Sequence, residues 1–441
     1  MVNGFDPSRL EDLDPAMQGA IRRRQALLGP AYRLMYADPV EVKRASGVFL
    51  YDSQGKAYLD AYNNVASVGH GHPRVVEAIH AQLQTLCTHT RYVQQGILDF
   101  AEDFVPSFGG PIEHVMFTCT GSEANDLALR IAKHKTGRNG IVITSEAYHG
   151  NSDLTAGLSP SLGKKSPLGT WVRRIPAPDS YRMKPREIGR TLASALQREI
   201  EELERRGEGL AAFIADSLFS SDGIYAHPTD VLSQVAEVVR RAGGVFIADE
   251  VQAGFGRSGE ALWGYQRHGL QPDIVTMGKP MGNGYPVAAV AMSHAVVESF
   301  GTNQRYFNTF GGNGVAIAAA QAVYDVVREE GLQANALKVG ALMQAGIGEL
   351  AATHEGIGDV RGTGLYIGVE FVKNRATKEP DSATALAVVD GMRKRRVLIS
   401  ATGPNANILK IRPPLVFSPA NADQLVATLD DTLKALRGRT A

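Results

Sequence analysis

Short apolar runs alternate with helix-period segments through the middle of the chain. From Ala124, apolar residues recur at the i, i+3, i+4, i+7 and i+8 positions, which predicts a helix. Four runs bounded by polar residues or glycine predict buried strands: Gly140–Ser145, Ala211–Ser217, Gly244–Glu250 and Asp273–Met277. Helix-period segments also stand between these runs, one with Leu192, Leu196, Ile200 and Leu203 on one face and one closed by Gly243. This alternation predicts an α/β fold with a mostly parallel sheet that binds ligands at the C-terminal ends of its strands.

The two ends of the chain differ in pattern from the middle. Residues Val48–Asp60 predict a strand, a turn and a strand, and a long helix is expected to start near Val315. Two further strands are expected at Gly364–Val372 and within Asn407–Ser418. We therefore expect a large domain over residues 71–320 and a smaller α+β domain that residues 1–70 and 321–441 share.

Composition restricts the class of protein. The 441 residues are 44% apolar and 21% charged, which is typical of a soluble globular protein. Lysine plus arginine equals aspartate plus glutamate, 46 each, so nothing favours nucleic acid or an anionic membrane as a partner. Two cysteines are too few for a disulfide framework or a thiolate metal site, so we expect no metal and a reducing, cytoplasmic location. No secretory leader or membrane span is visible.

The segment TCTGSEAND could hold a phosphate group. Thr120, Gly121 and Ser122 stand between a strand-like run and the helix that follows. Free amides and the positive end of a helix dipole meet there, and both favour an anion. The alternative is that Ser122 only caps the helix while Glu123 stabilises its first turn.

Two further strand ends carry candidate residues for the same edge of the sheet. Tyr148 and His149 follow the next strand, where an aromatic ring can stack on a flat ligand or simply pack. Asp249 ends an apolar strand, and a buried carboxylate there needs a cation, a metal or a protonated nitrogen as its partner.

Lys279 ends another apolar strand, thirty residues after Asp249. A buried lysine has a lowered pKa and becomes a nucleophile. A phosphate cradle, a stacking ring, a buried carboxylate and a buried amine are the four features that pyridoxal 5'-phosphate needs. In that cofactor the amine forms a Schiff base and the carboxylate keeps the ring nitrogen protonated. Thr309 adds a hydroxyl before a glycine-rich helix start.

Five segments in this order resemble the class III (ornithine/GABA type) branch of the fold-type-I, pyridoxal-phosphate-dependent aminotransferases: GSEAN, AYHG, IADEVQAGFGR, PDIVTMGK and NTFGG. The resemblance extends from about residue 58 to residue 415. It implies a homodimer with active sites at the subunit interface, possible further pairing into a tetramer, and Lys279 and Asp249 as catalytic residues. The cofactor-binding positions that it implies are Thr120, Gly121, Ser122, Tyr148, His149, Asp216, Asp249, Gln252, Lys279 and Thr309. Thr309 would reach the phosphate of the partner subunit.

The segment Asp216–Gly223 departs from the family pattern E-P-V-Q-G-E-G-G. The departure puts in doubt the glutamate that serves when amino donor and acceptor alternate. A smaller branch, the ethanolamine-phosphate phospho-lyases and their hydroxylysine-phosphate relatives, carries a serine in this position, which Ser217 matches. The segments Asn64–Ala66, Thr90–Tyr92 and Asn407–Lys410 also fit that branch.

The resemblance implies elimination of phosphate from O-phosphoethanolamine or a similar phosphorylated amine, giving an aldehyde, ammonia and phosphate. Lys279 would remove the carbon-bound proton, and cationic groups would hold the leaving phosphate. The substrate-pocket candidates are Asn64, Ser400, Lys410, Arg412, Tyr36 and Arg91. For Arg412 the alternative is an ion pair at the surface of the small domain. Two other functions stay open, a class III (omega-type) aminotransferase and a catalytically silent binding protein of this fold.

Overall fold

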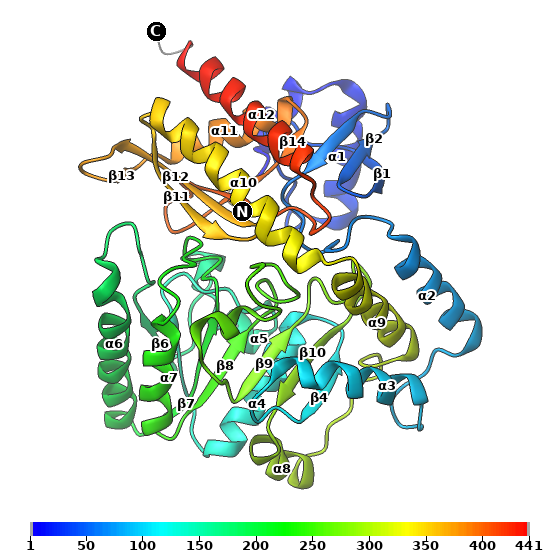
Figure 1. The fold of residues 1–441 in the computed structure, drawn as a ribbon, viewed down its shortest axis with the longest axis vertical. Helices are drawn as coiled ribbons and strands as arrows, with labels where there is room; N and C mark the ends of the chain where they lie inside the picture. The colour runs from blue at the N-terminus through cyan, green and yellow to red at the C-terminus, as the bar shows by residue number, and fades with distance from the viewer. Residues whose placement is uncertain (1–2, 439–441) are drawn as a thin grey trace.

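A seven-stranded sheet forms the core of the larger part of the molecule (Figure 1). The computed structural model describes residues 3–438. In spatial order the sheet runs β4 (His114–Thr118), β10 (Ala288–Met292), β9 (Ile274–Met277), β8 (Val245–Asp249), β7 (Leu210–Asp216), β5 (Gly140–Thr144) and β6 (Val172–Ile175). β10 runs antiparallel to β4 and β9, whereas β9, β8, β7, β5 and β6 pair in parallel. The four predicted strands are β5, β7, β8 and β9, and the α/β prediction is confirmed.

Each face of this sheet packs against its own helices because successive strand residues point to opposite sides. On β8, Ile247 belongs to one core cluster with Leu127 of α4 (Gly121–Thr136), on the side where α8 (His294–Asn303) also lies. Its neighbour Phe246 belongs to the other cluster, with α6 (Pro185–Arg205) and α7 (Val231–Arg241). The three predicted helices are α4, α6 and α7, and Gly243, just after α7, has a φ of 68°.

Two smaller sheets lie above the large one in Figure 1. The first runs β1 (Val42–Ser46), β2 (Phe49–Asp52), β3 (Ala57–Asp60) and β14 (Val397–Leu398), so early and late parts of the chain share one sheet. The second runs β11 (Ile357–Thr363), β12 (Tyr366–Asn374), β16 (Ile408–Ile411) and β15 (Ser400–Thr402), with β13 (Glu379–Pro380) beside β12. The domain limits at residues 70 and 320 stay a prediction.

The expected long helix from Val315 is two helices. α9 (Gly314–Glu329) ends at a break, and α10 (Leu332–Thr353) continues toward the small sheets. Gly331 stands at the break with a φ of 64°, which favours glycine there. α2 (Pro73–Thr85) and α3 (Gln95–Phe104) pack on α9.

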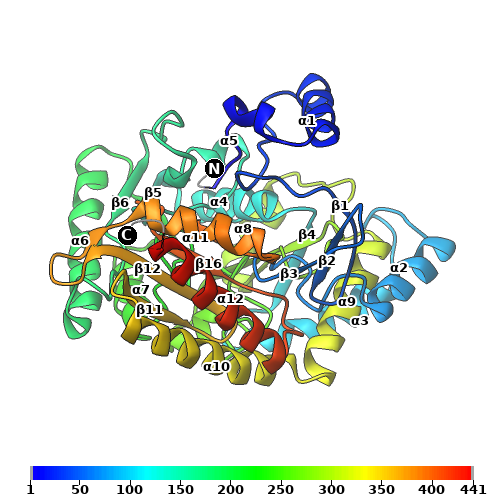
Figure 2. The same cartoon turned by 90° about the horizontal axis from the view of Figure 1, so that it is seen from above.

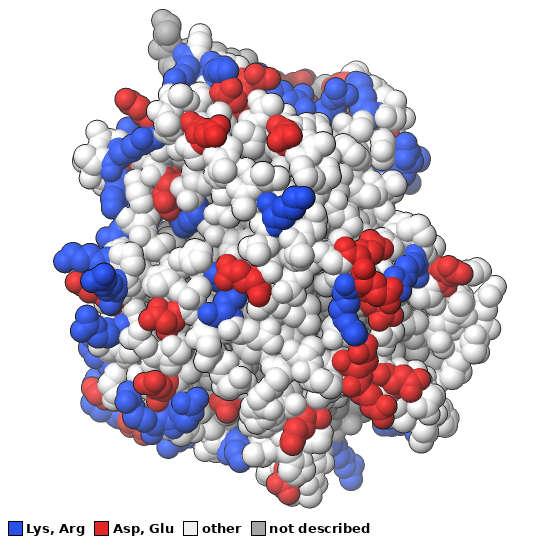
Figure 3. Space-filling model, in the orientation of Figure 1, with Lys and Arg blue, Asp and Glu red and all other residues white. Residues whose placement is uncertain are grey.

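The remaining elements are helices. They are α1 (Pro15–Leu28), which lies at the edge of the view in Figure 2, α5 (Asp153–Ala156), α11 (Ser382–Lys394), α12 (Pro419–Arg437) and the 3-10 helices Pro7–Asp12, Val105–Phe108, Pro160–Leu162 and Gly264–His268. Figure 3 shows basic and acidic side chains distributed over the same face of the molecule. Within residues 3–438, no helix combines the length and the apolar character that a membrane crossing requires.

Candidate active site

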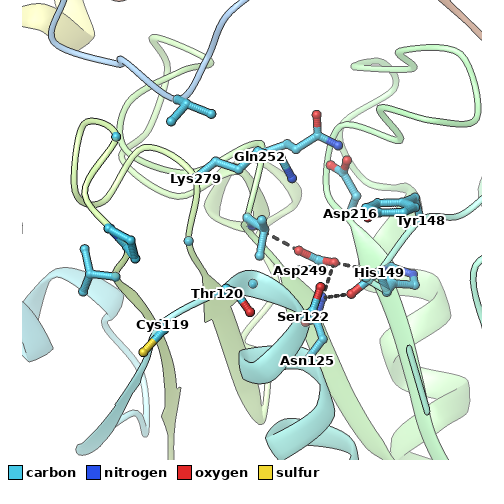
Figure 4. Close-up of a pocket in the computed structure, with 18 of the residues that line it drawn as sticks. Cys119, Thr120, Ser122, Asn125, Tyr148, His149, Asp216, Asp249, Gln252 and Lys279 are labelled. Carbon is cyan, nitrogen blue, oxygen red and sulfur yellow. Dashed lines mark hydrogen bonds and ion pairs between the residues drawn. The ribbon is translucent and has the colours of Figure 1, made fainter. Parts of the chain in front are cut away.

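A cavity of about 320 Å³ lies where β7, β8 and β9 end and α4 begins (Figure 4). Among the cofactor-binding candidates, all except Thr309 line it: Thr120, Gly121, Ser122, Tyr148, His149, Asp216, Asp249, Gln252 and Lys279. The C-terminal edge of a parallel sheet is where such a fold binds ligands, so the topology alone brings these residues together.

The start of α4 forms the anion-binding end of the cavity. Thr120 is the N-cap, with its hydroxyl accepting from the Glu123 amide at 3.2 Å, so the alternative in which Ser122 caps the helix is wrong. The Ser122 hydroxyl instead accepts from the Asn151 amide at 3.1 Å. A Cβ on Gly121 would lie 2.8 Å from a Val251 methyl carbon, so only glycine leaves this approach open. The helix dipole therefore faces the cavity with its positive end.

Gly278, directly before Lys279, also serves close packing. A Cβ there would lie 3.3 Å from the Gly121 backbone, and its φ is not in the left-handed region. Glycine at this position lets the end of β9 approach α4 and is not required for a sharp turn.

Asp249, at the end of β8, is 4% exposed and has three donors. Its Oδ2 lies 2.6 Å from His149 Nδ1 and accepts from Asn125 Nδ2 at 2.9 Å. Its Oδ1 accepts from the Val251 amide at 3.1 Å. A buried carboxylate held in this way needs no metal, and no cluster of metal-ligating side chains occurs among the described residues.

Lys279 follows β9 and faces the cavity with a half-buried side chain. Desolvation by the cavity walls lowers the pKa of Lys279 to about 8, and the Arg412 guanidinium acts in the same direction. Asp249 and Asp216 oppose the shift. An amine with this pKa is partly neutral near pH 8 and can serve as a nucleophile or a base.

A side-chain hydrogen bond joins the segments that follow β7 and β8 next to the cavity. Asp216 ends β7, and its carboxylate accepts from the amides of Leu218 and Ser220 at 2.9 and 3.1 Å. Burial raises the pKa of Asp216. The next residue, Ser217, donates its hydroxyl to Glu250 Oε1 at 2.6 Å. Glu250, next to Asp249, is fully buried and its pKa is raised by that burial to about 7.

A second wall carries two buried cations behind Gln252. Arg412 is 7% exposed; Nη1 donates to Asn64 Oδ1 at 3.0 Å and to Gln252 Oε1. The expected alternative, a surface ion pair, is therefore wrong for Arg412. Lys410 is 8% exposed, with Nζ 5.9 Å from the ring centre of Tyr366, and burial together with Arg412 holds the pKa of Lys410 well below its usual value. Neither cation lines the cavity, and Arg412 is joined to it through Gln252, which does.

Four candidates lie elsewhere in the single chain. Ser400 donates to Asn3 Oδ1 at 2.7 Å, and the Tyr36 hydroxyl donates to the Ile399 carbonyl at 3.0 Å, so both hydroxyls bond to other residues of the chain. Arg91 is exposed and lies 3.8 Å above the ring of Phe307. Thr309 is exposed on the same chain segment as Phe307. None of the four lines the cavity.

Two buried polar residues at the site were not predicted. Asn125 lines the cavity and contacts Asp249, and the Thr276 hydroxyl donates to Asn125 Oδ1 at 2.6 Å. The sequence signal for both is a single polar residue at a position where the pattern is apolar. Thr276 interrupts the apolar run Ile274–Met277, and Asn125 stands inside an apolar helix face.

The family model for class III aminotransferases matches residues 34–433. The chain belongs to the class III aminotransferase family. It is 40% identical to an ethanolamine-phosphate phospho-lyase homolog of Caenorhabditis elegans, over 94% of this chain and 92% of the relative. It is 39% identical to an alanine–glyoxylate aminotransferase 2-like protein of Drosophila melanogaster, over 94% and 87%. A phospholyase from Arthrobacter, solved in complex with phosphoethanolamine, superposes with a TM-score of 0.91 at 40% identity, covering 94% of this chain and 99% of that one.

These matches confirm the resemblance and the fold-type-I expectation. Enzymes of this class III family depend on pyridoxal 5'-phosphate, and the cavity fits that cofactor. The α4 start at Gly121 suits its phosphate, the buried Asp249 carboxylate suits a protonated ring nitrogen, and the Lys279 amine suits its aldehyde. Tyr148 stands at the wall where a flat ring would lie. The chain is thus a pyridoxal-phosphate-dependent enzyme, and the catalytically silent alternative is not favoured.

Proposed function

We propose that this enzyme eliminates phosphate from O-phosphoethanolamine or a similar phosphorylated amine. The observation that carries the proposal is the pair of buried cations, Lys410 and Arg412, behind Gln252. Arg412 donates only to neutral oxygens, and neither cation has an ion-pair partner among residues 3–438. An anionic ligand would raise the lowered pKa of Lys410 and supply acceptors to both buried basic groups, and a phosphate group does both.

The similarities support the same substrate class. The Arthrobacter structure contains phosphoethanolamine, and the Caenorhabditis elegans relative carries the phospho-lyase name, each at 40% identity. The aminotransferase name of the Drosophila melanogaster relative, at 39%, keeps transamination as the second candidate.

The residues of the chain divide the reaction between them. Bound pyridoxal phosphate supplies an electron sink for charge that develops on the substrate carbon. Lys279, with its lowered pKa, takes the proton from the carbon next to the substrate nitrogen. Asp249 holds a negative charge where the ring nitrogen would lie. As the neighbouring carbon–oxygen bond breaks, its electron pair leaves with phosphate, whose charge Lys410 and Arg412 stabilise. Water then converts the remaining product into aldehyde and ammonia.

The segment after β7 fits a reaction with a single substrate. Asp216–Gly223 contains no glutamate, and the Ser217 hydroxyl bonds to Glu250 inside the protein. Elimination does not alternate between an amino donor and an acceptor, so a glutamate that switches between them is not needed.

We also propose a homodimer in a cytoplasmic location. The surface near Arg91 and Thr309 exposes 65% of Tyr92, 92% of Val93 and 69% of Phe310. Exposed apolar side chains grouped in this way favour a protein partner, and a second copy would place Thr309 toward the other subunit's cavity. Sedimentation of the holoenzyme distinguishes a dimer, a tetramer and a monomer, and a monomer with full activity would contradict this part of the proposal. The unpaired Cys87 and Cys119 fit a reducing compartment.

The test supplies O-phosphoethanolamine alone to the holoenzyme. Released phosphate and acetaldehyde are expected in equal amounts, without any keto acid. If neither product forms, while an amine plus pyruvate yields alanine, the enzyme is an aminotransferase and the phospho-lyase proposal is wrong.

A further inference from the structure

We propose that Asn125 and Thr276 are positioning residues that fix the orientation of the Asp249 carboxylate toward the bound cofactor. Both are buried, with Thr276 fully enclosed and Asn125 1% exposed. The inference rests on the cofactor site and is independent of which reaction the enzyme catalyses.

The three residues meet because their elements share one face of the large sheet. Asp249 on β8 is paired with Thr276 on β9, so the two side chains point to the same side. Two residues earlier on each strand, Ile247 and Ile274 belong to the core cluster formed with α4. Asn125 projects from the start of α4 onto this face (Figure 4).

The hydrogen bonds leave the Asn125 amide only one orientation. Its Nδ2 donates to the His149 carbonyl at 2.8 Å and to Asp249 Oδ2 at 2.9 Å. Both partners are acceptors, so the amide nitrogen must face them and the amide oxygen must face away. On that side the Thr276 hydroxyl donates to Oδ1 at 2.6 Å. Thr276 therefore stabilises the orientation in which Asn125 serves Asp249.

The consequence is a difference between the two oxygens of Asp249. Oδ2 is held by both Asn125 and His149, whereas Oδ1 accepts a single backbone amide at 3.1 Å, from Val251. Oδ1 therefore has capacity for one further donor, and a protonated ring nitrogen is such a donor. Without Asn125, only His149 would restrain Oδ2 and the carboxylate could rotate.

The test compares Thr276→Val, which keeps the shape and removes the hydroxyl, with Thr276→Ser, which keeps the donor. Asn125→Ala removes the amide, and Asn125→Asp places a second carboxylate against Asp249. Thr432→Val is the matched control, because Thr432 is equally buried but its hydroxyl bonds to the Thr428 carbonyl in α12. The readouts are cofactor affinity of the cofactor-free protein, the pH titration of the visible band of the holoenzyme, kcat and KM, and the melting temperature of the cofactor-free protein.

Asn125→Ala is expected to weaken cofactor affinity and lower kcat by about tenfold to a hundredfold, the range for losing a buried hydrogen bond to a charged group. Thr276→Val, which loses a hydrogen bond between neutral groups, should lower both by about twofold to tenfold. KM for the amine should change little, and the pH midpoint of the visible-band titration should shift. Asn125→Asp should lose more cofactor affinity and more kcat than Asn125→Ala. Thr276→Ser should recover most of the loss.

Two results would overturn the proposal. The first is wild-type cofactor affinity and an unshifted band titration in Thr276→Val and Asn125→Ala, even if their melting temperatures fall as in Thr432→Val. The second is a Thr276→Ser variant as impaired as Thr276→Val, which would exclude the hydroxyl as the cause. If wild-type enzyme releases no phosphate from O-phosphoethanolamine while the variants still lose cofactor affinity, the proposed function fails and this inference stands.

Discussion

The wall of the cavity that holds Asp249 and the wall behind Gln252 differ in how far the chain itself satisfies their charged groups. Asp249 has three donors of its own, and Asn125 uses both amide hydrogens and its oxygen. On the other wall, Arg412 donates to neutral side chains and its Nε has no partner among the described residues. Lys410 lies 5.9 Å from the ring centre of Tyr366, and the carboxylate that acts on its charge, Asp216, is not within ion-pair distance.

The difference separates two ways of preparing a binding site. The Asp249 wall is preorganised, so little rearrangement is needed when its ligand binds. The Gln252 wall holds two buried basic groups whose desolvation is only partly offset, and burial lowers the pKa of Lys410, so an anionic ligand would stabilise their charged forms. One wall suits a resident cofactor and the other suits a substrate that comes and goes.

Lys279→Ala gives the largest expected effect and separates the two walls. Loss of the amine should lower phosphate release by about 10²–10⁴-fold, the usual contribution of a positioned proton acceptor. Cofactor should still bind non-covalently, because the Asp249 wall is unchanged. Phosphate release by colorimetry and bound cofactor by absorbance measure the two effects. Turnover retained in this variant would contradict the role of Lys279.

Arg412→Met tests the wall behind Gln252. Removing a buried charge that binds the substrate should lower kcat/KM for O-phosphoethanolamine by about a hundredfold or more. Because the Arg412 charge helps to lower the pKa of Lys279 to about 8, that pKa should rise. The rate increases as the Lys279 amine of the substrate complex loses its proton, so the low-pH limb of the kcat profile should move to higher pH.

The matched control for that experiment is Arg74→Met. Arg74 is exposed at the start of α2 and pairs with Glu329 of α9 at 2.7 Å, and neither residue lines the cavity. It should leave the pH profile unchanged. An Arg412→Met enzyme whose profile and kcat/KM match those of Arg74→Met would remove the distinction between the two walls.

Glu250→Gln examines the support behind the Asp249 wall through its pH dependence. Burial raises the pKa of Glu250 from 4.5 to about 7, so the folded protein favours the protonated form. That stabilisation is fully present below the unfolded pKa of 4.5 and is lost as pH rises through about 7, a change of about 3 kcal/mol. Glutamine does not titrate, so the variant should gain stability relative to wild type between pH 5 and pH 8.

Melting temperatures of the cofactor-free protein at four pH values measure this change. Glutamine also disturbs the bonds from Ser217, Gly264 and Tyr265, which lowers stability at every pH. Only the pH-dependent part reports the titration. A constant difference between wild type and variant across this range would show that Glu250 does not titrate there.

The sequence was most informative where local pattern and function coincide. Asp249 and Lys279 end apolar strands, and parallel strands end at one edge, so their meeting in one cavity follows from the pattern. The alternative of a cap at Ser122 lies two residues from the actual N-cap, because Thr120 and Ser122 are both good caps and only the backbone decides between them. The pattern does not indicate Asn125 and Thr276, because each is a single polar residue among apolar neighbours in the sequence. They come together only in the folded protein, where α4 packs on the sheet and their side chains form a hydrogen bond.

Contacts between distant parts of the chain explain the other misses. Ser400 and Tyr36 bond to Asn3 and to the Ile399 carbonyl, partners that the sequence around them does not indicate. The surface alternative for Arg412 failed because an early segment of the chain lies against it: the Arg412 amide donates to the Ala61 carbonyl at 2.9 Å and its guanidinium donates to Asn64. Such positions are set by tertiary packing and not by local periodicity.

Tyr36→Phe gives the smallest expected effect and tests how far the wall behind Gln252 extends. The Tyr36 hydroxyl donates to the Ile399 carbonyl at 3.0 Å and does not line the cavity. Its loss should cost about 1 kcal/mol of stability, typical of one buried hydrogen bond, seen as a slightly lower melting temperature. KM for O-phosphoethanolamine should be unchanged, because the phenyl ring keeps its packing. A tenfold rise in KM with an unchanged melting temperature would instead place this hydroxyl at the substrate and extend the charged wall to the N-terminal segment.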